Sequence, residues 1–185
     1  MPVQVRRATT QEAPVLADVA ARTFALACPP HVTPQAIATF VADVLSRGRF
    51  DEYLADPGRE VFLAHEGDDP AGYAMLVHGE PADPEVGAAL TLRPTVELSK
   101  IYVVPEHHGT GVSGALMTAC VDAARQRGAA GLWLGVNQLN ERAQRFYGKS
   151  GFTRVGTKRF LVGDRYEDDF VYERALAGWS FTSEP

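Results

Sequence analysis

The segment VELSKIYVVPEHHGTGVSGAL, residues 96–116, constrains the fold more strongly than any other part of the chain. Its β-branched first part predicts a strand that ends at Pro105, and the turn that follows contains Gly109 and Gly111 before a helix begins. Backbone N–H groups without helical partners converge at such a turn, and the helix dipole favours negative charge there. The segment therefore predicts a cradle for a ligand that carries phosphate.

The small residues of this turn indicate how closely a phosphate can approach the backbone. Gly109 and Gly111 carry no side chain there, and Ser113 and Gly114 continue a surface of small residues into the helix start. Glycines between a strand and a helix are also ordinary turn residues, so a purely structural turn stays open as the alternative. No Gly-Lys-Ser/Thr sequence follows, and no acidic residue ends the next predicted strand, which disfavours ATP and NAD.

Length and composition are typical of one folded domain. The chain has 185 residues and is 45% hydrophobic, so we expect a single domain over residues 1–185. A loop insertion is expected at about residues 79–95, and a frayed tail over residues 176–185. The sequence contains no long apolar run and no apolar signal-peptide core near its start. We therefore expect a cytoplasmic protein without a membrane partner.

Charge and residue types argue against several classes of function. The formal net charge is −5 and no basic patch is visible, which argues against a nucleic-acid partner. Cys28 and Cys120 are far apart and form no Cys/His cluster, so we expect two buried cysteines rather than a metal or redox site. His31, His65 and His78 are scattered, His107 and His108 are expected to be solvent-side turn residues, and none has a visible partner that would make a triad or a metal site. Neither a metal site nor covalent catalysis is predicted.

Hydrophobic periodicity predicts the element order β-α-α-β-β-β-α-β-α-β-β. Thr9 and Glu12 have capping-box spacing ahead of the first helix, and Thr33 followed by Pro34 marks the start of the second. Strands are expected over residues 3–8, 61–64, 72–77, 96–104, 131–136, 152–162 and 169–174, and helices over residues 9–28, 33–48, 50–55, 110–127 and 137–149. This order predicts a mixed sheet with helices on both faces, whose parallel part comes from the two strand-helix units of the second half.

Residues 96–174 resemble the Gcn5-related N-acetyltransferase (GNAT) superfamily in two separate motifs. IYVVPEHHGTGVSGALM is similar to the family's acetyl-CoA motif, Gln/Arg-x-x-Gly-x-Gly/Ala, and LWLGVNQLNERAQRFYGKSGF is similar to its second motif. The resemblance implies an α/β fold of GNAT type, with a mixed, mostly antiparallel central sheet and helices on both faces. ELSKIYV, the FY-x-K-x-GF run and F-x-x-G-x-x-x-x-x-D are closest in pattern to the PaiA-like spermidine/spermine N-acetyltransferases.

The resemblance implies acetyl-CoA as cosubstrate and a set of residues that hold it. These are Ile101, Tyr102 and Val103 for the pantetheine arm, His108, Gly109, Thr110, Gly111, Val112, Ser113 and Gly114 for the pyrophosphate, and Asn140 and Tyr147. His108 stands where the family has Gln or Arg, and Ser113 where it has Gly or Ala. The cradle would therefore depend on backbone donors more than on charge.

Acetyl transfer to an amine requires a group that removes a proton and a group that protonates the departing thiolate. By position in the family pattern, Tyr147 is the candidate acid and Glu97 the candidate base. The alternatives are a packed aromatic ring beside Phe146 for Tyr147 and an ordinary surface carboxylate for Glu97. The peptide N-terminal acetyltransferase branch uses a glutamate on the following strand, and here that position is Gly135, which argues against that branch.

The resemblance implies direct transfer of an acetyl group to a primary amine of a small cationic acceptor such as a polyamine. Two groups of carboxylates are candidates for its cation site: Glu80, Asp83 and Glu85 in the insertion, and Asp164, Glu167, Asp168 and Asp169 near the last turn. Acetylation of an amino acid, an antibiotic or a protein amine is the alternative, and so is a non-catalytic acyl-CoA-binding regulatory module. Assembly into a homodimer is left open.

Overall fold

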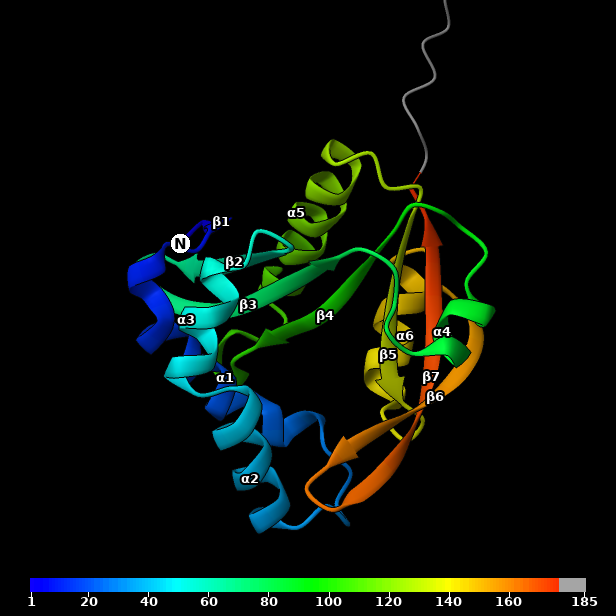
Figure 1. The fold of residues 1–185 in the computed structure, drawn as a ribbon. Helices are drawn as coiled ribbons and strands as arrows, with labels where there is room; N and C mark the ends of the chain where they lie inside the picture. Colours follow the sequence, from blue (N-terminus) through cyan, green and yellow to red (C-terminus); the bar gives the residue numbers. More distant parts are fainter. Residues whose placement is uncertain (177–185) are drawn as a thin grey trace, which may run out of the picture.

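The computed structural model describes residues 1–176, which form one seven-stranded sheet with helices on both faces (Figure 1). The strands are β1 (Val3–Arg7), β2 (Arg59–Glu66), β3 (Asp69–His78), β4 (Thr95–Val103), β5 (Gly131–Asn137), β6 (Thr153–Val162) and β7 (Arg165–Ala175). The helices are α1 (Ala13–Ala27), α2 (Pro34–Val44), α3 (Arg47–Ala55), α4 (Pro84–Ala89), α5 (Val112–Gln126) and α6 (Glu141–Lys149), with short 3-10 turns η1 (Thr10–Glu12) and η2 (Pro105–His107). The expected α/β class and mixed, mostly antiparallel sheet are confirmed.

The strand order is β1-β2-β3-β4-β5-β7-β6, and every neighbouring pair is antiparallel except β4 with β5. The expectation that two strand-helix units supply parallel pairs is therefore correct for β4-α5-β5 alone. After α6 the chain forms β6 and turns back through Gly163, which has φ of 65°, so that β7 lies between β5 and β6. Strand β7 therefore separates β6 from β5.

The two faces of the sheet are covered by different helices. On one face, α1, α2 and α3 pack against large side chains that include Tyr73 and Met75. On the other face, the apolar stripe of α5 packs against β2 to β5 through Leu116 and Cys120. The predicted capping box is confirmed, because the Thr9 backbone N–H donates to the Glu12 carboxylate at 2.7 Å, and it opens η1 directly before α1. No helix within residues 1–176 is long and apolar enough to cross a membrane.

The insertion after β3 is folded against the sheet rather than free. Asp83 caps the short helix α4 by accepting from the Glu85 backbone N–H at 2.9 Å. Further along, the buried carboxylate of Glu173 on β7 accepts from the backbone N–H groups of Thr91 and Leu92 at 3.0 and 3.1 Å. The expected loop therefore contains a helix and is held by hydrogen bonds that no local sequence signal indicates. The expected tail lies almost entirely outside the described residues.

The parallel pair β4–β5 positions the site, because its pairing ends early. Residues 95–97 of β4 pair with residues 131–133 of β5, after which both strands continue without pairing to each other. Figure 1 shows the two strands moving apart. A β-bulge also interrupts the pairing of β4 with β3, where Leu76 lies opposite Leu98 and Met75 opposite Lys100, so Ser99 is the extra residue. The free edges of β4 and β5 therefore border an opening in the middle of the sheet.

Candidate active site

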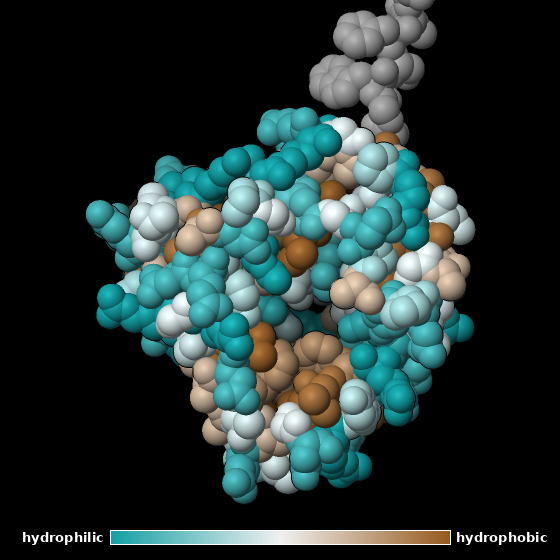
Figure 2. Space-filling view, in the orientation of Figure 1, coloured by the Kyte–Doolittle hydropathy of each residue, from teal (hydrophilic) through white to brown (hydrophobic). Residues whose placement is uncertain are grey.

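A cavity of about 510 Å³ lies at this opening and reaches both faces of the sheet. Its walls come from α1, α2, β4, β5, α6, β6, β7 and the turn before α5. Figure 2 shows a hollow in this face of the molecule, bordered by hydrophobic residues on one side. The cavity therefore extends from the predicted phosphate turn to the space beneath α1 and α2, which we call the chamber.

The phosphate turn has the backbone conformation that its glycines predict. Gly109 has φ of 80° and Gly111 has φ of 92°, both in the left-handed region that disfavours side chains. Gly111 is the N-cap of α5, so the unpaired N–H groups of the helix start face this turn. His108 donates from Nε2–H to the Val103 carbonyl oxygen at 2.8 Å, so its ring is held against the end of β4.

Most of the predicted cofactor residues line the cavity. These are Ile101, Tyr102, Val103, His108, Gly109, Ser113, Asn140 and Tyr147. Thr110, Gly111, Val112 and Gly114 form the turn and helix start beside it but do not line it, and the Val112 side chain is buried in the core. Their contribution to a ligand would come from the backbone.

Alternation along β4 divides its side chains between the two sides. Ile101 and Val103 pack with the core under α5, whereas Tyr102 packs with the core under α1 and α2. Asn140 caps α6 by accepting from the Ala143 backbone N–H at 3.1 Å, so its carbonyl oxygen is engaged and its amide nitrogen is the group left for a ligand. The backbone edge of β4 is accordingly presented to the cavity between two apolar layers.

Tyr147 comes from α6 and lines the cavity. Its ring packs edge-on against Phe152, with centroids 5.9 Å apart, and no hydrogen bond joins its hydroxyl to another residue among those described. Burial, followed by the proximity of Tyr102, raises the pKa of Tyr147 well above its usual value. The phenol is therefore protonated throughout the neutral range and able to donate a proton.

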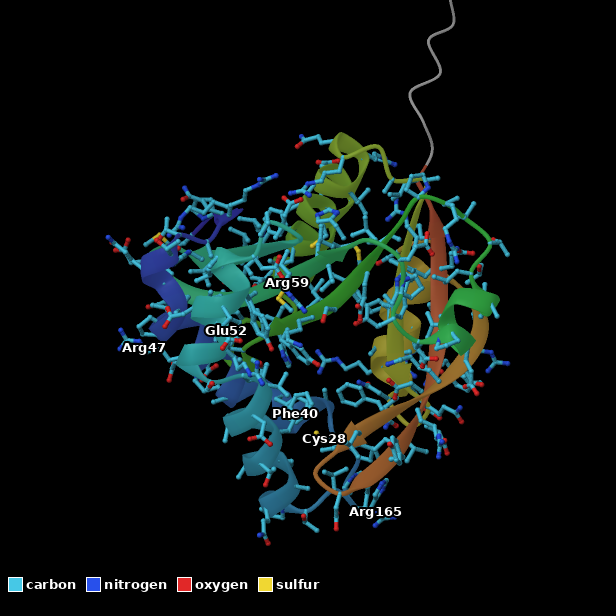
Figure 3. The ribbon with its side chains drawn as sticks, in the orientation of Figure 1. Cys28, Phe40, Arg47, Glu52, Arg59 and Arg165 are labelled. Carbon is cyan, nitrogen blue, oxygen red and sulfur yellow. The ribbon has the colours of Figure 1, made fainter. Side chains whose placement is uncertain are left out.

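The chamber under α1 and α2 is aromatic at one end. Phe24 and Phe40 stack with centroids 4.3 Å apart, and Phe160 of β6 lies 5.5 Å from Phe40. Figure 3 shows Phe40 and Cys28 between the first two helices and the β6–β7 hairpin. Cys28 is half-buried rather than buried as expected, and burial together with Glu167 raises its pKa to about 11, so its thiol is not a nucleophile at neutral pH.

Charged side chains from three strands and one helix also line the cavity. These are Glu97 and Lys100 on β4, Arg142 on α6, Lys158 on β6, and Glu167 and Asp169 on β7. Burial raises the pKa of Glu97 against the opposing influence of Lys158 and Lys100. Burial also lowers the pKa of Lys100 to about 8. A carboxylate at position 97 that takes up a proton more readily than usual is suited to the role of base.

Glu167 and Asp169 line the cavity as part of the predicted cation site, but the other candidates do not. Glu80 pairs with Arg93 at 2.9 Å, Asp83 caps α4, and the insertion lies away from the chamber. Lys100 and Lys158 were missed as site residues by sequence reasoning. Regular alternation would place Lys100 and Glu97 on opposite faces of β4, and the bulge at Ser99 brings them to the same side. Nothing local indicates this bulge, or that Lys158 reaches the opening.

Three of the histidines have carboxylate partners that the sequence did not indicate. His31 contacts the Glu167 carboxylate at 2.8 Å, His78 contacts Glu60 at 2.8 Å, and His107 contacts Glu66 at 2.6 Å. Each pair joins residues far apart in sequence, which is why local reasoning missed them. No group of three or more His, Cys, Asp or Glu side chains within residues 1–176 is arranged to hold a metal ion.

Comparisons with known proteins give the same assignment as the motifs. The acetyltransferase (GNAT) family profile matches residues 25–152. An N-acetyltransferase of Mycobacterium tuberculosis, named as uncharacterized, is 48% identical over 165 residues, which cover 89% of this chain and 98% of the relative. The streptothricin acetyltransferase of Streptomyces lavendulae is 34% identical over 140 residues, covering 75% of this chain and 68% of the relative.

The fold is also found in solved structures. The PaiA N-acetyltransferase of Thermoplasma acidophilum, solved in complex with coenzyme A, matches with a TM-score of 0.75 and 16% identity over 95% of this chain and 99% of that one. At that identity the likeness concerns the fold alone. Profile, relatives and fold agree, and the chain belongs to the acetyltransferase (GNAT) family of acetyl-CoA-dependent N-acetyltransferases.

Proposed function

We propose that this enzyme transfers the acetyl group of acetyl-CoA directly to a primary amine of a small cationic acceptor, polyamines included. The observation that carries the proposal is that one continuous cavity passes through the β4–β5 opening. One end has a turn suited to phosphate, and the other has carboxylates suited to an ammonium group. A thioester and an amine that enter from opposite faces would meet at the opening.

The residues present fit coenzyme A. The backbone of residues 101–103 pairs with β3 on one side and borders the opening without a β5 partner on the other. The groups that point away from β3 could therefore pair with the amides of a pantetheine arm, except the Val103 carbonyl, which accepts from His108. Residues 108–114 supply backbone donors for the pyrophosphate, and Asn140 supplies an amide N–H. The cosubstrate brings the acetyl group as a thioester.

We assign the base to Glu97 and the acid to Tyr147. An acceptor ammonium carries three protons: one passes to Glu97 and on to solvent, one ends on the coenzyme A sulfur by way of Tyr147, and one stays on the amide. The neutral amine attacks the thioester carbonyl, the C–N bond forms, and the C–S bond breaks. Glu97 and Tyr147 both line the cavity, on the β4 edge and on α6, as this division of roles requires.

Two observations bear on the acceptor. Three carboxylates in the chamber favour a cation, whereas Lys100 and Lys158 limit how many positive charges one acceptor can bring. A relative named streptothricin acetyltransferase makes the amine of an antibiotic the second candidate. The acceptor is therefore expected to be a small amine that places one ammonium group at the opening.

The test is a panel assay of coenzyme A release from acetyl-CoA with spermidine, spermine, diamines, amino acids, aminoglycosides, streptothricin and lysine peptides. We expect amine-dependent release with at least one small amine, and acetylation of that amine by mass spectrometry. Calorimetric binding of acetyl-CoA without turnover of any amine would instead indicate a regulatory module and overturn the proposal.

A further inference from the structure

Asp169 is a buried carboxylate that takes no part in the proton transfers assigned to Glu97 and Tyr147. The residue is 6% exposed and lines the cavity, yet no hydrogen bond or ion pair joins its carboxylate to another of residues 1–176. Glu167, two residues earlier on the same strand, has His31 as a partner. Its carboxylate oxygens are open to the cavity rather than sealed inside the protein, so a ligand in the cavity can donate hydrogen bonds to them.

The side chains of Asp169 and Lys158 both lie close over Gly135, which has no side chain of its own. A Cβ at position 135 would lie 3.1 Å from Lys158 Cδ, 3.2 Å from Asp169 Oδ2 and 3.4 Å from Lys158 Nζ. The two charged atoms therefore flank the same point beside β5, although they form no ion pair with each other. Gly135 follows Trp133, the last β5 residue that pairs with β4, so this point lies directly at the opening.

We propose that Asp169 binds the ammonium group of the acceptor on the cavity side of its carboxylate, and that it determines the enzyme's preference for cationic acceptors. The proposal rests on the function proposed above and specifies the group that recognises its substrate. A carboxylate only accepts hydrogen bonds when ionised, and an ammonium group only donates them, so the two are complementary. Glu97 on the neighbouring edge is then left free to take the proton.

The charges around Asp169 allow this role at neutral pH. The pKa of Asp169 is raised to about 6, chiefly by burial; Lys158 on β6 opposes this shift, and Glu167 and Asp168 on its own strand add to it. Tyr102 faces it from β4. Asp169 is therefore ionised above about pH 6 and loses its charge below it, so we expect the KM for the acceptor to rise as the pH falls through that value.

Steady-state kinetics of Asp169→Asn with acetyl-CoA and, as probes, spermidine, L-lysine and benzylamine test the proposal. We expect the acceptor KM to rise by about tenfold or more, with kcat changed much less and the KM for acetyl-CoA unchanged. Asp168→Asn is the matched control, because Asp168 is exposed on the adjacent position and does not line the cavity. An acceptor KM within twofold of wild type in Asp169→Asn would overturn the proposal.

A second pair of variants separates charge from structure. Asp169→Gly removes the carboxylate, and Gly135→Asp added to it returns a carboxylate to the same space from β5. We expect the double variant to have a lower acceptor KM than Asp169→Gly alone, and an equal KM in a folded protein that binds coenzyme A would contradict the proposal.

The wild-type enzyme alone gives a third test, which needs no folded variant. An acceptor KM that stays constant as the pH falls below 6 would overturn the role of Asp169. If the wild-type enzyme shows no turnover with any amine, the proposed function fails; if it turns over but Asp169→Asn leaves the KM unchanged, only this inference fails.

Discussion

Glu97 lies opposite Trp133 at the last paired position of β4 and β5, and beyond this pair the two strands separate. The Trp133 ring is buried under α4 with Val86 and Leu90, which fixes β5 on one side of the opening. Glu97 therefore lies at the point where the two strands separate, with the free edge of β4 on one side of the opening and Gly135 of β5 on the other. This placement is the basis of its assignment as the base.

We expect Glu97→Gln to lower kcat by about a hundredfold or more, because the amine would lose its proton acceptor. In the wild-type enzyme, burial raises the pKa of Glu97, so activity is expected to fall with decreasing pH at a higher pH than for an ordinary glutamate. The pH–rate profile of kcat measures this limb, which Glu97→Gln should remove. Glu85→Gln, at an exposed position outside the cavity, is the control; a profile that is unchanged in Glu97→Gln would assign the base elsewhere.

We expect Tyr147→Phe to lower kcat by about 10² or more while coenzyme A affinity stays near that of wild type, since only the proton donor is removed. Turnover and calorimetry on the same preparation measure both quantities. Tyr166→Phe, 60% exposed and away from the cavity, should behave as wild type. Full activity in Tyr147→Phe would leave Tyr147 a packing residue.

Gly111→Ala is expected to weaken coenzyme A binding about tenfold and to destabilise the fold by roughly 1–2 kcal/mol. The reason is its φ of 92°, a conformation that costs an L residue about that much. Gly48→Ala is the control: Gly48 lies inside α3 with no atom within 4 Å of the new Cβ, so it should stabilise the protein by about 0.5–1 kcal/mol. Thermal melts and calorimetry test both variants, and equal affinities would argue against a phosphate turn at Gly111.

Asp169→Asn is expected to raise stability at neutral pH. The pKa of Asp169 is raised from 3.8 to about 6, so the folded state loses stability as the pH rises between these values. Removing the charge should therefore stabilise the protein at pH 8 by up to about 3 kcal/mol, and the gain should vanish near pH 4. Denaturant unfolding at the two pH values measures it. A variant less stable than wild type at pH 8 would mean that Asp169 has a stabilising partner.

The local signals in the sequence were sufficient for most elements. The hairpin of β2 and β3, the strand-turn-helix around Gly109 and the capping box at Thr9 all follow from periodicity, glycines and caps, and all are present. Those features depend on residues close together along the chain. The fold class followed from the resemblance that these segments carry.

What sequence reasoning missed depends on contacts between distant segments. Lys158 and Asp169 lie opposite each other only through the β6–β7 register. His31 reaches Glu167 across 136 residues, and Thr91 reaches Glu173 across 82. No periodicity or motif indicates contacts between residues so far apart in the sequence. The charged lining of the cavity could therefore be recognised in the sequence only as a group of acidic residues.

The central claim is that thioester and amine occupy one continuous cavity and react directly. Calorimetry with a conjugate that links the coenzyme A sulfur through an acetyl bridge to the best amine of the panel tests it most directly. Because both halves would bind at once, we expect the conjugate to bind about a hundredfold or more tighter than coenzyme A alone. A conjugate that binds no tighter than coenzyme A would contradict direct transfer through the β4–β5 opening.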